Sequence, residues 1–434
     1  MSTTIIRNGQ IIDPINRRDE IADLYIADGT IVGSKSEIRE ELTRRGGKSK
    51  IEEIDAKGLI VAPGLIDMHV HLREPGFSHK ETIESGARAA AAGGFTTVLC
   101  MPNTSPAADN PSTIAWIKDR AAKAACVNVL PTGAISKSLA GEELAPIGSL
   151  AQAGIVAITD DGHCVQNDEV MRRAVEYARM VDVPVLDHCQ DYDLVGNGVA
   201  HEGYWSTLLG LPGWPAAGEE AIVMRNILLA ELCDHHIHCQ HLTTAGSVRL
   251  LREARARGVK ISGEVCPHHI ALTDEAIQNF DTNYKMNPPL RAQADVDALL
   301  DGIADGTLSI LSSDHAPHAN FEKEVEFDVA PFGIIGLETE LGLFLDLLVN
   351  KHRKIDIVRL IKMYTVEPAR LLKIDAGTLG VGVAADVTLI DPDLEWTVKV
   401  EKFESESRNS PFEGWKLKGR AVRTIVDGKT VWKL

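Results

Sequence analysis

The chain has 434 residues, and its 45 Lys and Arg against 62 Asp and Glu give a formal net charge of −17, with 44% hydrophobic residues. This composition is typical of one large or two smaller folded domains and excludes a disordered chain. The acidic balance argues against a nucleic-acid or anionic-membrane surface, because both need clustered Lys and Arg. We therefore expect neither nucleic acid nor membrane as a partner.

The cysteine content and the apolar segments bear on the compartment. Seven cysteines, an odd number scattered along the chain, do not make a disulfide framework. The start MSTTIIRNGQ lacks the features of a signal peptide. The longest apolar stretch, FGIIGLETELGLFLDLLV, is interrupted by acidic residues and falls short of the roughly 20 apolar residues of a membrane span. These features predict a soluble, cytoplasmic protein.

Residues 1–62 are predicted to form short strands. The segments TTIIRNGQII, DLYIADGTIVG and IEEIDAKGLIV are rich in β-branched residues, and NG and DG pairs mark turns. This part of the chain is predicted to be one half of a small β-sandwich domain.

Residues 63–375 alternate short apolar runs with helical patterns, which indicates repeated βα units around a parallel sheet. The eight runs are LIDMHVHL, FTTVLCMPN, VNVLPTGAI, GIVAITDD, VPVLDHCQ, HHIHCQHL, KISGEVCPHH and LSILSSDHA. The helical patterns include KETIESGARAAAAGG, PSTIAWIKDRAAKAA, DEVMRRAVEYARM and SVRLLREARARG. Eight strands over about 250 residues or more predict an α/β fold of the (β/α)8 barrel type. A doubly wound open sheet is the alternative, although it usually has fewer strands.

Two further segments complete the chain. The polar segment FEKEVEFDVAPFG, which follows the eighth run, is predicted to be a loop over the barrel mouth. Residues 376–434 contain the strand patterns DVTLIDP and WKLKGRAVRTIVDGKTVWKL, with a DG turn. They are predicted to complete the β-sandwich domain, which both termini would then share.

Histidine and aspartate residues stand at the ends of five predicted strands. His69 and His71 are two residues apart, so that both side chains point to one face of the first strand. Any single one of these residues could be a buried polar group or a helix cap, but the carboxyl ends of barrel strands form one active-site rim. The set is His69, His71, Asp160, Asp161, His188, His241 and Asp314.

This combination of imidazoles and carboxylates suits Zn(II), which binds nitrogen and oxygen and can leave a position open for water. Two ions about 3.5 to 4 Å apart, bridged by a carboxylate and a hydroxide, would use all of these ligands. One zinc ion with a bound water is the alternative. We therefore expect one or two zinc ions per chain.

The run CDHHIHCQH looks like a zinc motif of its own. On a strand, however, Cys239 and His241 would share one face, while His236 and His238 would share the other. The run therefore cannot close a four-ligand site by itself, and Cys239 is interpreted as a packing residue. The roles of His268 and His269, at the mouth of the seventh strand, stay open.

Further polar residues are expected at the same mouth. Arg73 follows the first strand and Asn103 ends the second. Because Arg binds carboxylates in a bidentate way, Arg73 suggests an anionic substrate, with a salt bridge at the rim as the alternative. Additional donors and backbone groups would come from Asn287, His318, Phe332 and Gly333.

The motifs HVHLREPG, MPNT, TDDG, HCQD, NYKMNPPLR, SDHAPH and APFGIIGLET occur in this order and spacing. With them the sequence resembles the class I dihydroorotases of the cyclic amidohydrolase superfamily, over nearly the whole chain. The HxH pair marks only the superfamily, whereas MNPPLR together with SDHAPH is more specific. The resemblance implies a TIM-like metal-dependent hydrolase barrel that catalyses the reversible cyclisation of N-carbamoyl-L-aspartate to L-dihydroorotate in pyrimidine synthesis.

The resemblance also implies a role for each site residue. The first zinc would be bound by His69, His71 and Asp314, the second by His188 and His241, and Asp161 would bridge the two. The substrate α-carboxylate would be held by Arg73, Asn103 and His318. The ureido group or ring amide would be recognised by Asn287 and the backbone of Phe332 and Gly333, and His71 also falls among the substrate contacts.

In the hydrolytic direction, the resemblance implies that a metal-bridging hydroxide attacks the ring amide carbonyl, with Asp314 as general acid and base. One departure from the family pattern is Gln190, which stands where an acidic residue is expected beside His188.

Two other functions are weighed against this one. Hydantoinases and other relatives bridge their metals with a carboxylated Lys, which is missing from GIVAITDDGHC, so that hydantoinase or allantoinase is disfavoured. A non-catalytic structural partner of aspartate transcarbamoylase is disfavoured because all six ligand positions are filled. We expect a homo-oligomer, and association with aspartate transcarbamoylase stays open.

Overall fold

The computed structural model of the chain describes residues 3–34, 36 and 51–434. Its centre is a ring of parallel strands: β6 (Leu65–Val70), β7 (Phe95–Cys100), β8 (Asn128–Pro131), β9 (Val185–Asp187), β12 (Ile237–Cys239), β13 (Ile261–Val265) and β14 (Ile310–Leu311). Parallel bridges from Ile158 to Gly133 and Val185 join β8 to β9, and the bridge between Val70 and His315 closes the ring. The predicted barrel is confirmed, with its fourth strand reduced to the bridges of Ile158.

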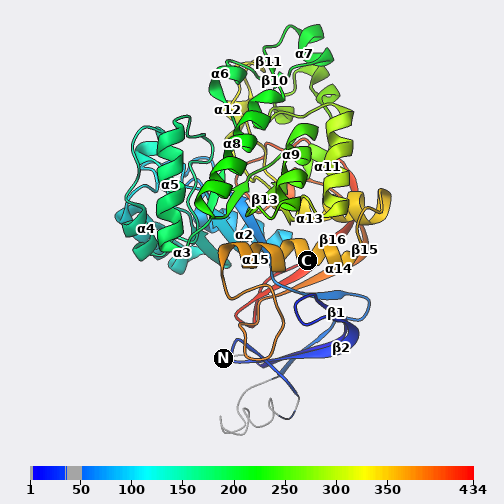
Figure 1. The fold of residues 1–434 in the computed structure, drawn as a ribbon. Coiled ribbons are helices and arrows are strands. Elements are labelled where there is room, and N and C mark those ends of the chain that lie inside the picture. The colour runs from blue at the N-terminus through cyan, green and yellow to red at the C-terminus, as the bar shows by residue number, and fades with distance from the viewer. Residues whose placement is uncertain (1–2, 35, 37–50) are drawn as a thin grey trace.

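Helices cover the outside of the ring (Figure 1). The four helical patterns named above correspond to α2 (Ile83–Gly93), α3 (Pro111–Ala124), α5 (Asp168–Val181) and α9 (Ala245–Ala256). The buried residues of α5 are Met171, Ala174, Val175 and Ala178, at the spacing of one helix face. This apolar face packs on the barrel and leaves the charged face to solvent.

The other helices are α4 (Ile147–Ala153), α6 (Tyr192–Val195), α7 (Tyr204–Leu209), α8 (Ala217–Cys233), α10 (His268–Ala271), α11 (Gln293–Asp305), α12 (Asn320–Lys323), α13 (Glu340–Phe344), α14 (Ile357–Tyr364) and α15 (Val366–Leu372). Shorter or irregular turns are η1 (Lys137–Leu139), η2 (Asp274–Asn279), η3 (Thr282–Tyr284), η4 (Leu345–Lys351) and η5 (Val400–Lys402), and β10 (Ala200–His201) pairs with β11 (Gly213–Trp214). Among the described helices, none combines the length and the apolar character needed to cross a membrane.

Both termini contribute strands to one domain, as predicted, and within the described residues these strands form one eight-stranded hydrogen-bonded sheet, whereas the sequence predicts a β-sandwich. Its strand order is β17-β16-β15-β5-β1-β2-β3, and β4 pairs with β1. The strands are β1 (Thr3–Asp13), β2 (Arg18–Ala27), β3 (Thr30–Val32), β4 (Ile51–Asp55), β5 (Ile60–Pro63), β15 (Val387–Thr397), β16 (Lys416–Val426) and β17 (Lys429–Lys433). The domain limits at 62/63 and 375/376 stay a prediction, and residues 35 and 37–50 of the N-terminal segment lie outside the described residues.

Two of the three predicted turns in this sheet are confirmed, and one is wrong. Asp28 with Gly29, between β2 and β3, and Asp427 with Gly428, between β16 and β17, take positive φ as tight hairpin turns require. The predicted turn at Asn8 and Gly9 is wrong, because β1 continues through it with a shift in register against β2. A Cβ on Gly9 would lie 2.4 Å from Val61, so this glycine serves the close approach of β5.

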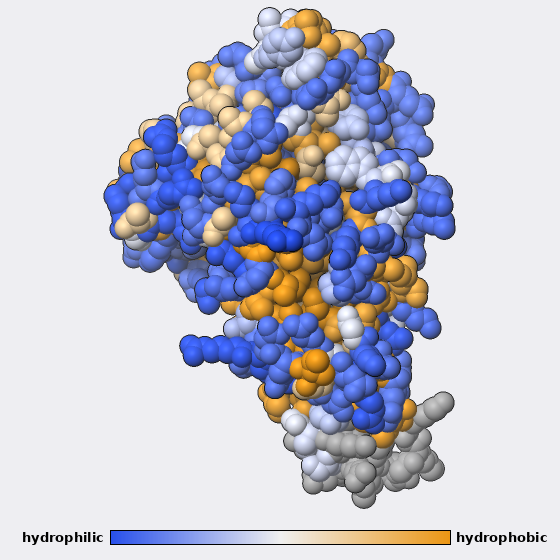
Figure 2. All heavy atoms as spheres, turned by 90° about the vertical axis from the view of Figure 1, so that its right-hand side faces the viewer, coloured by the Kyte–Doolittle hydropathy of each residue, from blue (hydrophilic) through white to orange (hydrophobic). Residues whose placement is uncertain are grey.

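The terminal sheet packs against the barrel through α2. Thr424 donates a hydrogen bond to the carbonyl of Ala91, and Thr388 donates one to the carbonyl of Gly94, both at 2.6 Å. In the side view of Figure 2, hydrophobic residues gather at mid-height, while the upper part of the face is largely hydrophilic. Since β5 runs directly into β6, the sheet also fixes where the first barrel strand begins.

Candidate active site

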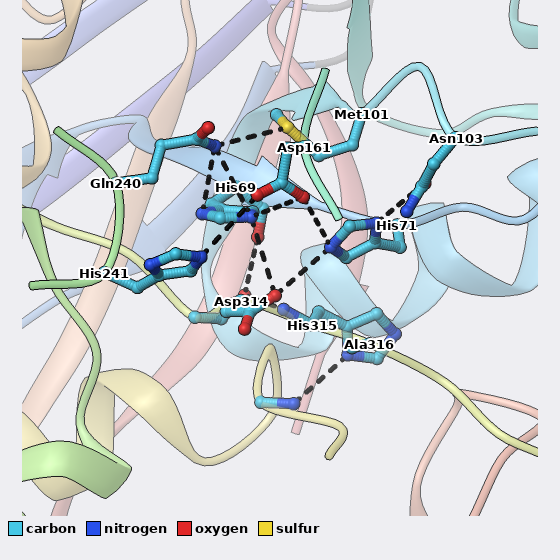
Figure 3. A network of polar contacts seen from close by, with 12 residues as sticks. His69, His71, Met101, Asn103, Asp161, Gln240, His241, Asp314, His315 and Ala316 are labelled. Atoms are coloured by element: carbon cyan, nitrogen blue, oxygen red, sulfur yellow. Dashed lines mark hydrogen bonds and ion pairs between the residues drawn. The ribbon is translucent and has the colours of Figure 1, made fainter. Parts of the chain in front are cut away.

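The six predicted ligand side chains meet at the carboxyl end of the barrel strands, and Figure 3 labels all of them except His188. Asp161 lies between two pairs of imidazoles. Its Oδ2 is 3.2 Å from Nε2 of His69 and 3.3 Å from Nε2 of His71. Its Oδ1 is 3.6 Å from both Nδ1 of His188 and Nε2 of His241. The two oxygens of Asp161 therefore face two different sets of nitrogens.

Asp314 completes the first of these sets. Its Oδ1 lies 3.2 Å from Nε2 of His71 and 3.6 Å from Nε2 of His69. The backbone of Asp314 has a φ of 45°, in the left-handed region that non-glycine residues rarely adopt. Such unusual backbone conformations are concentrated at functional sites.

His241 reaches the site by a route that differs from the predicted one. Strand β12 ends at Cys239, and His241 follows it with a φ of 31°. The predicted pairing of His241 with Cys239 on one face is therefore wrong, because the left-handed backbone turns His241 toward the centre after the strand has ended. His236 and His238 share a face as predicted, since both rings contact the Ser262 hydroxyl. His238 and Gln240 point into the barrel interior, where Nε2 of Gln240 lies 3.3 Å from Nδ1 of His69.

Three of the ligand imidazoles have their second nitrogen fixed by a dedicated acceptor. Nδ1 of His71 donates to Oδ1 of Asn103 at 2.9 Å, and Nε2 of His188 donates to Oε1 of Gln190 at 2.9 Å. Nδ1 of His69 donates to the Glu264 carboxylate at 2.6 Å. Because each acceptor requires the proton on that nitrogen, the other nitrogen presents a lone pair to the carboxylates, as a metal ligand does.

The spacing of the donor atoms fits zinc. Tetrahedral ligands at about 2.0 to 2.1 Å from zinc lie about 3.3 Å from one another. The nitrogen-to-oxygen distances around Asp161 and Asp314 span 3.2 to 3.6 Å. In addition, Oδ1 of Asp161 is buried without a hydrogen-bond partner among the described residues. The donor set thus fits a metal-binding role for these residues.

The ionisation of Asp161 and Asp314 also fits a metal-binding role. Burial alone would raise the pKa of Asp161 and Asp314, but contacts with His69 and the other imidazoles hold both pKa values below their usual range. Within the described part of the chain, neither carboxylate forms an ion pair with Lys or Arg. Buried ionised carboxylates are costly unless a cation faces them. In the absence of a metal, imidazole protons supply that positive charge, and bound metal ions would take their place while the imidazoles act as ligands.

A cavity of about 230 Å³ opens above these residues. It brings together every predicted substrate contact with five of the six predicted ligands. Its lining is His71, Arg73, Asn103, Asp161, Gly162, His188, His241, Asn287, Asp314, Ala316, His318, Phe332 and Gly333. His69 lies beneath the cavity floor, fully buried. The volume suits a small molecule of about the size of one heterocyclic ring.

The loop after the eighth strand covers one side of this cavity, as predicted. Lys323, at the end of α12, is buried and donates to the carbonyls of Lys285, Pro331 and Gly333 at 3.3, 2.9 and 3.1 Å. Burial, assisted by nearby Lys285, lowers the pKa of Lys323 to about 7. Gly333 has a φ of 122°, and a Cβ there would lie 2.7 Å from Ala316. Lys323 thus anchors the segment that presents the Phe332 and Gly333 backbone.

His318 and Phe332 contact each other in this structure. Nε2 of His318 donates to the carbonyl of Phe332 at 2.8 Å. Burial, together with the cations Arg73, Lys80 and Lys323, lowers the pKa of His318 to about 2, so that its imidazole is neutral. His318 is therefore a neutral donor at the cavity wall.

Several other polar residues support the site without lining it. Asp160 accepts hydrogen bonds from the backbone of Ile135 and Ser136 at 2.8 and 3.0 Å, so it fixes the loop after β8 and is not a ligand. His269, whose role the sequence leaves open, donates to the carbonyl of Pro288 at 3.0 Å and thereby holds the loop that carries Asn287.

Two residues of functional interest are missed by the sequence reasoning. Glu264 has a detectable signal, since a carboxylate inside an apolar predicted strand needs a buried partner. Lys323 has none, because it lies in a polar loop whose path the sequence does not specify. The partners of both residues become known only once the strands and the loop are placed in three dimensions.

Comparison with known proteins adds sequence relatives over the whole chain. The Dihydro-orotase-like family model matches residues 58–247, and the Amidohydrolase family model matches residues 219–431. A dihydroorotase of Citrifermentans bemidjiense is 50% identical over 429 residues, which are 99% of each chain. A dihydroorotase of Pelotomaculum thermopropionicum is 50% identical over 427 residues, which are 98% of each chain.

Solved structures with the same fold are more distant in sequence. The L-hydantoinase (dihydropyrimidinase) from Arthrobacter aurescens matches 100% of this chain and 96% of its own, with a TM-score of 0.88 and 24% identity. A dihydropyrimidinase from Brevibacillus agri matches 99% of this chain and 95% of its own, with a TM-score of 0.84 and 25% identity. The likeness to the L-hydantoinase shows the fold alone, so the sequence relatives carry the assignment to a family.

Proposed function

The chain belongs to the dihydroorotase family of amidohydrolases, and we propose from this that it catalyses the reversible cyclisation of N-carbamoyl-L-aspartate to L-dihydroorotate in pyrimidine biosynthesis. It is a cyclic amide hydrolase that acts on a small molecule. The position of Arg73 supports the proposal most directly, because this cation has no ion-pair partner among the described residues and lines the same cavity as the candidate metal ligands.

We further propose that the site binds two Zn²⁺ ions. His69, His71 and Asp314 would hold the first, His188 and His241 the second, and Asp161 would bridge them. The support is the division of contacts at Asp161, whose two oxygens face the two sets separately. When bound, the ions would polarise the amide carbonyl and lower the pKa of water, which supplies a nucleophile near neutral pH.

Asp314 is proposed as the general acid and base. Its carboxylate lines the cavity and is ionised at neutral pH, so that it can accept a proton. In hydrolysis Asp314 would take a proton from the attacking water and return it to the leaving ring nitrogen. In the biosynthetic direction the transfers reverse, and Asp314 would accept the proton of the attacking ureido nitrogen.

Arg73, Asn103 and His318 are proposed to hold the substrate α-carboxylate. Asn103 uses its oxygen to accept from His71, which leaves its amide nitrogen as the donor toward the cavity. His318 donates to the Phe332 carbonyl in this structure, so binding a carboxylate through His318 requires that this hydrogen bond be exchanged. Asn287 and the Phe332 and Gly333 backbone would recognise the ureido group or ring amide, and His71 would contact the substrate from the metal side.

The partners and the compartment are also proposals. We propose a homo-oligomer, which the exposed apolar side chains of Tyr177, Met180, Met224, Leu228 and Leu232 on α5 and α8 support. Association with aspartate transcarbamoylase is retained as a second proposal. A reducing compartment such as the cytoplasm is supported by the seven cysteines, all of which are free thiols.

A substrate panel tests the function. The purified protein is assayed in the hydrolytic direction with L-dihydroorotate, unsubstituted hydantoin and allantoin, and kcat/KM is compared. A carboxylate held by a bidentate Arg contributes about 2 to 5 kcal/mol, so we expect a preference for L-dihydroorotate of about 30-fold or more. Equal or greater kcat/KM for hydantoin would favour a hydantoinase and contradict the proposal.

A further inference from the structure

Glu264 occupies a position in the barrel interior that the proposed chemistry does not use. It lies on β13 and is 1% exposed. Its Oε1 accepts from Nδ1 of His69 at 2.6 Å and also from the backbone N–H of His241 at 3.2 Å. The same carboxylate oxygen thus contacts a candidate ligand of each proposed metal site. It contacts the ring of His69 at the first site and the backbone of His241 at the second.

The other oxygen of Glu264 is held from below. Nε2 of His238 donates to Oε2 of Glu264 at 3.1 Å. Nδ1 of His238 then accepts from the hydroxyl of Ser262 at 2.7 Å, and that hydroxyl oxygen accepts from Nε2 of His236 at 2.8 Å. Each group in this series has one consistent donor or acceptor role when the histidines are neutral. The series ends in the wall of a separate cavity at the amino ends of the barrel strands.

The contact with His241 matters because of its backbone. At a φ of 31°, His241 adopts a conformation that persists only where surrounding groups hold it. Nδ1 of its ring has no hydrogen-bond partner among the described residues. Glu264 therefore provides a fixed contact to the backbone of a candidate ligand whose Nδ1 has no such contact within the described part of the chain.

We propose that Glu264 is a positioning residue for the metal centre, and that His238 holds Glu264 in the required orientation. Glu264 keeps the proton of His69 on Nδ1, so that Nε2 presents its lone pair to the metal, and it fixes the turn that aims His241. This inference rests on the proposed metal site. An acceptor that orients a metal-bound imidazole typically contributes 10- to 100-fold in metal affinity.

The test measures zinc affinity by competition with a chelator, starting from metal-free protein. Glu264→Gln keeps the size of the side chain but removes its charge and one of its two acceptor oxygens. Glu338→Gln is the matched control, because Glu338 is a buried carboxyl that accepts from the backbone of Ser405 and touches none of the candidate ligands. We expect zinc affinity to fall about 10- to 100-fold in Glu264→Gln and to stay within twofold of the parent in Glu338→Gln.

If Glu264→Gln does not fold, a second pair of variants at His238 tests the positioning role. His238→Gln keeps a donor for Glu264 and an acceptor for Ser262, whereas His238→Leu removes both. We expect His238→Leu to weaken zinc binding by about three- to tenfold and His238→Gln to remain within twofold of the parent. The visible spectrum of the Co²⁺-loaded proteins should change in His238→Leu and not in His238→Gln, because it reports ligand geometry and not merely folding.

The outcomes separate this inference from the metal site on which it rests. A parent protein that binds no zinc would overturn both. A parent that binds zinc together with a folded Glu264→Gln of equal affinity would overturn only the positioning role. The positioning role also fails if Glu338→Gln loses as much affinity as Glu264→Gln, or if the two His238 variants behave alike.

Discussion

Arg73 donates a hydrogen bond from Nε to the backbone carbonyl of Pro317 at 3.1 Å. This contact fixes the base of the guanidinium, while its two terminal nitrogens make no hydrogen bond with the described part of the chain. No described carboxylate lies within ion-pair distance of them either. Burial lowers the pKa of Arg73 to about 10, so the group remains a cation at neutral pH. An oriented cation at a cavity wall is prepared for an anionic ligand.

Replacement of Arg73 by Met should therefore act on the substrate that has a carboxylate. Truncating one partner of a charge-assisted pair costs about 2 to 5 kcal/mol, which is roughly 30- to 5000-fold in kcat/KM. We expect a loss of this size for L-dihydroorotate, measured in the hydrolytic direction. Activity on unsubstituted hydantoin and the zinc content should hardly change, because His69 and His71 are untouched. Equal losses on both substrates would show that Arg73 supports the fold instead.

Replacement of Asp314 by Asn should separate metal binding from proton transfer. The amide oxygen can still serve as a ligand, but the amide cannot accept a proton at neutral pH. We expect substantial zinc retention together with a fall in kcat of about 10²- to 10⁴-fold. Metal analysis and steady-state kinetics on the same preparation provide the two readouts. A kcat within a few-fold of the parent would remove Asp314 from the role of general base.

Gln190 offers a test of how His188 is oriented. Its Oε1 accepts the proton of His188 Nε2, so an amide here does what an acidic residue would do. Gln190→Leu removes the acceptor, and we expect zinc affinity to fall about tenfold or more, whereas Gln190→Glu should remain close to the parent. Chelator competition measures both. If Gln190→Leu binds zinc as tightly as the parent does, the acceptor has no part in metal binding.

The barrel and its rim could be predicted because the signals are local. Alternating runs specify strands, and the carboxyl ends of parallel strands must share one face, so His69, Asp161 and Asp314 converge in any closed barrel. The two sequence-based predictions that are wrong, the facing of His241 and the turn at Asn8, depend on backbone conformation. The left-handed turn at His241 is in contact with Glu264 on another strand, and Gly9, beside Asn8, allows the close approach of Val61 on β5, so that neither feature can be read from the local sequence alone.

The interior contacts could not be predicted for a related reason. Glu264 and His69 are separated by 195 residues and meet only across the closed ring. Lys323 reaches its three carbonyl partners only after the loop has folded over the mouth. No fixed separation along the sequence predicts either set of contacts, so these supporting contacts are known only from the tertiary structure.

Glu338 predicts a pH dependence of stability. Burial raises its pKa from 4.5 to about 8. Between these pH values the folded state holds a proton that the unfolded state lacks, so the free energy of unfolding falls as pH rises, by at most about 1.4 kcal/mol per pH unit. Glu338→Gln removes this contribution. The Tm of the variant relative to the parent should rise steadily from pH 5 to pH 8, and a constant difference would place Glu338 in a solvated environment.

The most direct measurement is a zinc titration of the purified, chelator-treated protein without any partner, followed by hydrolysis of L-dihydroorotate. We expect no turnover in the metal-free protein and a rise to full activity at two zinc equivalents per chain, because all six candidate ligands belong to one chain. A folded protein that binds zinc and leaves L-dihydroorotate unchanged would contradict the proposed dihydroorotase activity and favour a structural partner of another enzyme.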